Sequence, residues 1–156
     1  MTPALLGVGH DALFGGIAAA GFGVLFNFRP WTLAWCFASG ALALAVRSLG
    51  RDAGWSLEAA SFVAAFLVTV AATGLLRRIL GTYGSAVAVA GCIPMVPGAF
   101  FAQALLGLFA MTDPHAAANP AGALNTVAYL LQVVFTLGGI GAGIAIPLHI
   151  LRHREF

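Results

Sequence analysis

The chain has very few charged residues and no lysine. Only 8% of its 156 residues are charged, against roughly 25% in soluble domains, while 61% are hydrophobic and the mean hydropathy is +0.99. A soluble core this apolar would leave too little polar surface to face water. The composition therefore excludes a soluble domain and predicts an all-α integral membrane protein, with the lipid bilayer as its main surroundings.

Several function classes are excluded because their residue patterns are missing. The seven arginines are scattered along the chain, so we expect no nucleic-acid surface. No nucleophile motif, phosphate loop or paired set of acids and histidines falls within one apolar run, so we expect no enzyme. The two cysteines and four histidines have no ligand spacing, and neither a metal nor another cofactor is expected.

Apolar runs divide the chain into five candidate spans of a single transmembrane domain. A span needs about 20 apolar residues, and the second run has only 16, so a four-span bundle stays open if this run does not cross. The fourth run has 27 residues, about 40 Å of straight helix against ~30 Å of hydrocarbon. The approximate spans are 8–28, 31–46, 57–76, 85–111 and 124–148.

The arginines predict the orientation of the chain. If all five runs cross, one side holds two arginines and the other side holds five, and positive charge prefers the cytoplasm. This places the C-terminus in the cytoplasm and the N-terminus outside, with every arginine at the periphery. The smaller set is Arg47 and Arg51, and the larger is Arg29, Arg77, Arg78, Arg152 and Arg154.

The fourth run contains two prolines three residues apart, in the stretch IPMVPG (93–98). Pro94 and Pro97 have no amide hydrogen to donate to the carbonyls of Ala90 and Ile93, and each disfavours a helical conformation in the residue before it. We therefore predict that this span is broken near its centre. An ordinary proline kink that only shapes the bundle is the alternative.

The second half of the broken span has the features of a binding site. Pro97 is suited to the first position of a helix, and the amides that follow it would stay free at the positive end of the half-helix. Broken helices of this kind form substrate sites in secondary transporters. The candidate binding residues are Ala90, Ile93, Pro94, Met95, Pro97, Gly98, Ala99 and Asn27, with Phe100 supplying a further free amide.

Two acids lie at the outer mouths of predicted spans, Asp11 before the first and Glu58 in the third. An acid within a membrane segment is a candidate proton carrier, whereas a solvated carboxylate at a helix N-terminus is an ordinary structural feature. Both interpretations stay open. Asn27, at the inner end of the first span, is either a helix cap or an amide that lines a cavity.

Glycines are concentrated on the first and last spans. Small residues let helices approach closely in lipid, so we expect these glycines to pack helices together, partly against another chain, including a second copy of this one. The glycines are Gly15, Gly16, Gly21, Gly23, Gly138, Gly139, Gly141 and Gly143.

The chain resembles the threonine/serine exporter family, specifically its short, separately encoded C-terminal half, the YjjB-type subunit. Asp11, sixteen residues ahead of Asn27, also falls where that short subunit carries an aspartate. The stretches that carry the resemblance are GFGVLFNFRP (21–30), EAASFVAAFLV (58–68), IPMVPG (93–98) and GIAIP (143–147).

This resemblance implies an exporter of small carboxylate-bearing metabolites in the bacterial inner membrane. The substrates would be threonine- or serine-type amino acids or a dicarboxylate such as succinate, and a larger membrane subunit would be the partner. Export would be secondary and driven by the proton gradient. A non-transporting scaffold for the large subunit and a passive channel are the alternatives.

Joined to the broken span, the resemblance suggests a mechanism. The substrate carboxylate would dock on the free amides after Pro97, and the carbonyls of Ala90 and Ile93 would meet an ammonium or hydroxyl group. Glu58, or as second choice Asp11, would carry the proton. An additional cation near the site would favour a dicarboxylate over an amino acid.

Overall fold

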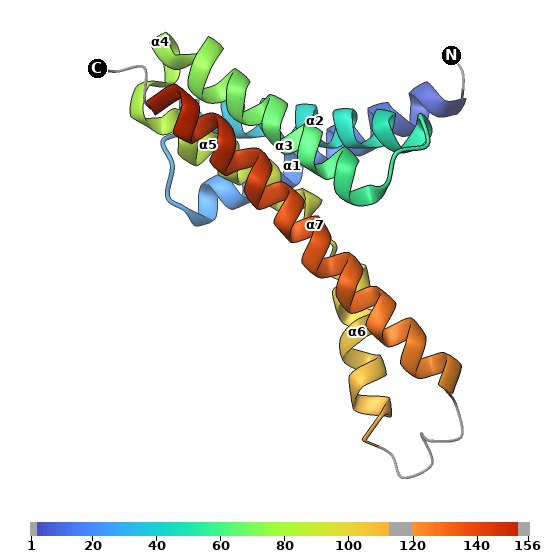
Figure 1. Cartoon of the computed structure of the whole chain (residues 1–156). Coiled ribbons are helices and arrows are strands. Elements are labelled where there is room, and N and C mark those ends of the chain that lie inside the picture. Colours follow the sequence, from blue (N-terminus) through green and yellow to red (C-terminus); the bar gives the residue numbers. More distant parts are fainter. Residues whose placement is uncertain (1–2, 113–119, 153–156) are drawn as a thin grey trace.

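The computed structural model describes residues 3–112 and 120–152, and in these ranges the chain is helical with short turns and no β-strand (Figure 1). Its elements in chain order are α1 (Pro3–Leu25), α2 (Pro30–Asp52), α3 (Leu57–Val70), the π-helix η1 (Ala71–Leu75), α4 (Arg77–Leu80), the 3₁₀-helix η2 (Gly81–Tyr83), α5 (Gly84–Cys92), the 3₁₀-helix η3 (Ile93–Met95), α6 (Gly98–Ala110) and α7 (Pro120–Arg152).

In the described part of the chain, four helices are long and apolar enough to cross a membrane, and a bent pair makes a fifth. The predicted all-α membrane fold is confirmed. The second helix has 23 residues rather than the 16 of its apolar run, because it continues through Arg47 and Arg51 to Asp52. The four single helices are Leu6–Leu25, Pro30–Asp52, Leu57–Gly74 and Ala121–Leu151.

The fourth span is broken, as the two prolines predict. The segment Gly81–Met95 and the helix Gly98–Ala110 meet at an angle of 53°. Figure 1 shows α6 and the first half of α7 leaving the other helices together. The break therefore lies where α6 leaves the bundle formed by α1, α2 and α3.

The turn between α1 and α2 explains Asn27. The amide of Phe28 donates to the carbonyl of Gly23, and the amide of Asn27 donates to Val24, which is the Schellman pattern that ends a helix. Asn27 has φ +57°, in the left-handed region that asparagine tolerates better than most residues. Pro30 then begins α2, where its missing amide hydrogen costs nothing.

The turn between α2 and α3 explains Glu58. Gly54 ends the preceding turn with φ +84°, and the hydroxyl of Ser56 accepts a hydrogen bond from the amide of Ala59 at 3.2 Å. Ser56 is thus the N-cap of α3, and Glu58 lies in the first turn, where a carboxylate is stabilised by the helix dipole.

Small residues allow the helices to approach closely. Gly15 on α1 lies against the backbone of Gly40 on α2, and Gly143 on α7 lies against the carbonyl of Phe62 on α3. A methyl group at any of these glycines would meet backbone atoms, so they pack helices as predicted. Of the glycines on α1 and α7, Gly16, Gly23 and Gly139 also face another helix, whereas Gly21, Gly138 and Gly141 face open space.

Candidate functional site

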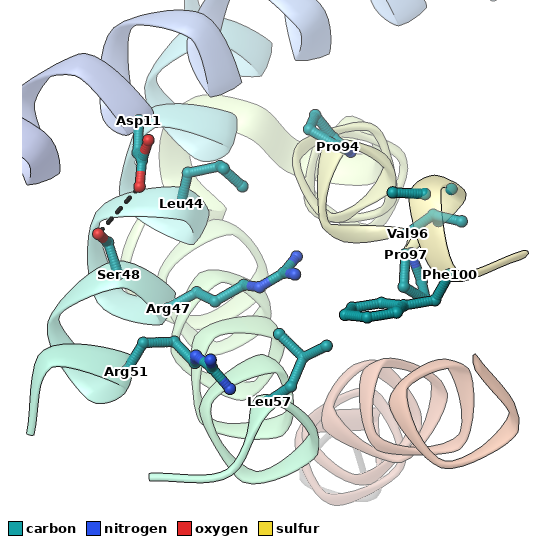
Figure 2. A pocket seen from close by; sticks show the side chains of 12 residues that line it. Asp11, Leu44, Arg47, Ser48, Arg51, Leu57, Pro94, Val96, Pro97 and Phe100 are labelled. Carbon is teal, nitrogen blue, oxygen red and sulfur yellow. Dashed lines mark hydrogen bonds between the residues drawn. The ribbon is translucent and has the colours of Figure 1, made fainter. Parts of the chain in front are cut away.

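A cavity of about 530 Å³ lies beside the break in the fourth span (Figure 2). Three helices and the break meet around it, so residues far apart in the sequence share its walls. The bundle side is formed by Asp11 from α1, by Leu44, Arg47, Ser48 and Arg51 from α2, and by Leu57 from α3. The break and the start of α6 supply Pro94, Val96, Pro97, Gly98, Ala99 and Phe100.

The break itself is a pair of tight turns. The amide of Val96 donates to the carbonyl of Ile93 at 3.0 Å, which closes the 3₁₀ turn. The amide of Gly98 donates to the carbonyl of Val96 at 2.8 Å across Pro97, whose φ of −80° and ψ of 65° form an inverse γ-turn.

Three details of the predicted break are therefore wrong. The carbonyl of Ile93 and the amide of Gly98 were both expected to be free, and both are paired within the break itself. Pro97 is the residue before α6 rather than its first residue. The 3₁₀ turn pairs the carbonyl of Ile93, while the γ-turn pairs the amide of Gly98 and delays the helix by one position.

Two backbone donors remain available at the start of α6. The first helical hydrogen bond of α6 runs from the amide of Phe101 to the carbonyl of Pro97 at 3.1 Å. The amides of Ala99 and Phe100 precede it and donate to no acceptor in the described part of the chain. Both residues line the cavity, at the positive end of a 13-residue helix.

Arg47 lies at the centre of this site. Its side chain is half-buried and reaches from α2 toward the break (Figure 2), where Nη1 donates to the carbonyl of Met95 at 2.7 Å. The expectation that every arginine is peripheral is thus wrong for Arg47. In the sequence this charge simply ends an apolar run, but in the structure it faces the cavity beside the break.

The residues of α2 that line the cavity follow a regular spacing in the sequence. Leu44, Arg47, Ser48 and Arg51 follow the spacing i, i+3, i+4 and i+7, which places them on one side of a helix. All four line the cavity. The pattern becomes visible only when α2 is extended beyond 31–46, and the charged residues were the reason for ending it there.

Asp11 and Ser48 form the rim of the cavity. The hydroxyl of Ser48 donates to Oδ2 of Asp11 at 2.9 Å (Figure 2). Nδ1 of His10, which is exposed, lies 3.6 Å from Oδ1 of the same carboxylate. The second of the two predicted proton carriers therefore lies at the site, while Glu58 is half-buried in α3 and does not line the cavity.

The other predicted binding residues have different surroundings. Met95 contributes its carbonyl to Arg47, while its side chain is fully buried. Ala90 is fully buried in α5 and does not line the cavity. Asn27 is exposed at the end of α1 and also lies outside the lining. Among the residues that the structure describes, no group of histidine, cysteine and acidic side chains is placed to hold a metal.

The family model described as threonine/serine exporter, ThrE, matches residues 11–150 of the chain. The chain belongs to this exporter family. The family resemblance of the four quoted stretches is thereby confirmed, and the family is one of membrane transporters. The match includes Asp11, α2 and the whole break, so every wall of the cavity lies within the family region.

A relative from Haemophilus influenzae is 29% identical over 138 residues, and its description is an uncharacterized protein. The matched region covers 88% of this chain but only 46% of that relative. The chain therefore spans less than half the length of this curated relative. No solved structure matches the chain.

Proposed function

We propose that this chain is the small subunit of a secondary exporter of small polar metabolites, working in the bacterial inner membrane with a larger membrane subunit. The observation that supports this proposal is the cavity at the α5–α6 break, where Arg47, Arg51 and two unpaired amides face one space. Its volume of about 530 Å³ lies in the range of small-molecule sites, roughly 300–1,000 Å³. Threonine and serine are the substrates that the family description names.

The substrate carboxylate docks at the start of α6. The amides of Ala99 and Phe100 point to an anion at the positive end of the helix, as at other helix N-termini that bind anions. Gly98 keeps the approach open, since a Cβ there would have no atom within 4 Å. Because the carbonyl of Ile93 is already paired, an ammonium group would instead meet Asp11 at the rim.

Asp11 is the proposed proton carrier. A proton and the ammonium group of an amino acid would compete for the same carboxylate, so entry of a proton from outside would release the substrate there. This competition couples inward proton flow to export. Glu58 does not line the cavity and has a sufficient structural role in the first turn of α3.

A dicarboxylate such as succinate is the second candidate substrate. Arg47 and Arg51 lie one helical turn apart on the same wall of the cavity. Two guanidinium groups can each bind one carboxylate, so the pair suits a dicarboxylate better than a substrate with a single carboxylate. The carboxylate of Asp11 at the rim favours an amino acid instead. Efflux assays with L-threonine, L-serine and succinate, with the large subunit co-expressed, decide between the two classes.

The proposal is tested by removing the break. The double variant Pro97→Ala, Gly98→Ala restores the amide hydrogen of residue 97 and favours a continuous helix. We expect the complex to assemble while efflux from proteoliposomes is lost. Unimpaired efflux from an assembled double variant would rule out the break as the binding site.

A scaffold without a transport path is the competing proposal, since this chain spans only 46% of the Haemophilus influenzae relative and a path in the remaining length would lie outside it. The path would then lie wholly in the large subunit, held by the small-residue faces of this chain. Vesicles that contain the large subunit alone discriminate: efflux at the rate of the full complex supports the scaffold. A passive channel, in turn, predicts flux that does not respond to the proton gradient.

A further inference from the structure

Arg47 makes the only side-chain hydrogen bond to the break within the described ranges, from α2 to the carbonyl of Met95 at 2.7 Å. Met95 is the last residue of η3, two positions before Pro97 and directly before the turn that leads into α6. The bond therefore ties the bundle to the point where the fourth span bends by 53°.

The partner of Arg47 is neutral, which is unusual for a half-buried guanidinium. No carboxylate forms an ion pair with Arg47 in the described part of the chain, and Asp11 directs its oxygens to Ser48 and His10. A guanidinium holds a carboxylate more strongly than a neutral carbonyl, because opposite charges attract and the pair can form two parallel hydrogen bonds. A carboxylate that accepts from both terminal nitrogens of Arg47 takes the place of the single bond from Nη1 to the carbonyl of Met95.

We infer that Arg47 also binds the substrate carboxylate that docks on the amides of Ala99 and Phe100, and that it does so by giving up its hydrogen bond to Met95. This inference rests on the proposed function, because it assigns a role within the same cavity. Binding of a carboxylate to Arg47 releases the break from α2. Binding of the anion is thereby coupled to movement of α6.

The packing of α6 allows such a movement. Among its residues only Ala104 is buried, and large side chains such as Leu106 and Phe109 are 69% exposed. Its contacts within the chain are mainly with α7, including the ring pair of Phe100 and Tyr129 at 5.9 Å. With the bond to Arg47 released, α6 can change its angle at the break while it shifts along α7, which continues as one helix to Arg152.

The inference is tested by measuring the distance between spin labels on α2 and α6. Labels are placed at Leu49→Cys and Phe109→Cys in the assembled complex, because both positions are exposed while the native Cys36 and Cys92 are at most 2% exposed. The probes are L-threonine and succinate, with L-threoninamide as the matched compound that lacks a carboxylate. The distance distribution is compared in wild type, Arg47→Gln and Arg51→Gln.

We expect both carboxylates, but not the amide, to shift the wild-type distribution. Arg47→Gln should already show the shifted distribution without any probe and should lower carboxylate affinity about tenfold or more. Arg51→Gln is the matched control, because it removes the same charge from the same wall without touching Met95, and its distribution without a probe should be that of wild type.

An unliganded Arg47→Gln distribution identical to wild type would overturn the inference, as would a wild-type distribution that does not move when a carboxylate binds. If Arg47→Gln fails to assemble, the wild-type distances measured with increasing carboxylate decide alone: a shift supports the inference, and no shift on binding overturns it. The proposed function fails separately, when no carboxylate binds or is exported. The comparison of unliganded variants needs no substrate, so the two failures are distinguishable.

Discussion

Ser48 on α2 donates a hydrogen bond of 2.9 Å to Oδ2 of Asp11 on α1, and this bond joins the first two spans at the rim of the cavity. The other oxygen of Asp11 lies 3.6 Å from His10, on the exposed side. The cavity walls thus hold two arginines and a single carboxylate. Protonation of Asp11 removes the one negative charge that an ammonium group would meet.

The first prediction concerns this carboxylate. Asp11→Asn keeps the size of the side chain but cannot release a proton, so amino-acid efflux should lose its acceleration by an inward proton gradient. Efflux from proteoliposomes at a series of external pH values measures this. Glu58→Gln is the matched control and should keep the pH dependence, and a normal pH response in Asp11→Asn would remove that residue from proton coupling.

The second prediction concerns the contact that holds α5 against α2. The hydroxyl of Ser39 donates to the carbonyl of Val87 at 3.2 Å, and a methyl group at Gly91 would overlap the side chain of Ser39. Gly91→Ala should therefore push α5 away and lower the free energy of unfolding by about 1–3 kcal/mol. Unfolding of the purified chain in mixed micelles provides the measurement.

Gly141→Ala is the control for this substitution. Gly141 lies inside α7 and a Cβ there would have no atom within 4 Å, so alanine should leave the free energy of unfolding unchanged or raise it by up to ~1 kcal/mol. Equal loss of stability in both variants would mean that the close approach at Gly91 is not the cause.

The third prediction concerns the native thiols. Cys36 and Cys92 are both free and buried, at 0% and 2% exposure, among small residues of α2 and α5. N-ethylmaleimide should therefore modify neither residue in the folded chain and both after unfolding in detergent. Mass spectrometry of the two samples measures this, and rapid modification of either thiol before unfolding would contradict the packing of these helices.

The break could be predicted from the sequence because its cause is local. Pro94 and Pro97 remove two helical hydrogen bonds wherever they occur, and the run 85–111 is too long for one straight span. The cap role of Asn27 could also be anticipated, since the end of α1 is a local turn. The prolines did not predict that the carbonyl of Ile93 and the amide of Gly98 find new partners within the break. Those bonds depend on the backbone dihedral angles of the turn, which the prolines alone do not determine.

The position of Arg47 could not be predicted in the same way. A charged residue after an apolar run has the same sequence appearance whether it faces water at the membrane edge or a cavity between helices. The difference arises from the tertiary contact between α2 and the break, whose residues are 48 positions apart in the Arg47–Met95 pair. The choice between Asp11 and Glu58 depends on the same kind of tertiary contact, since of the two only Asp11 lines the cavity.

The most direct test of the account asks whether water and substrate reach the start of α6. Gly98→Cys places a thiol in the open space of the cavity, whereas Gly141→Cys places one in open space on α7 that we assign to lipid. In the assembled complex, an anionic methanethiosulfonate should label residue 98 but not residue 141, and L-threonine or succinate should slow the labelling of residue 98. A thiol at position 98 that stays unlabelled, or that neither compound protects, would contradict a carboxylate site at the break.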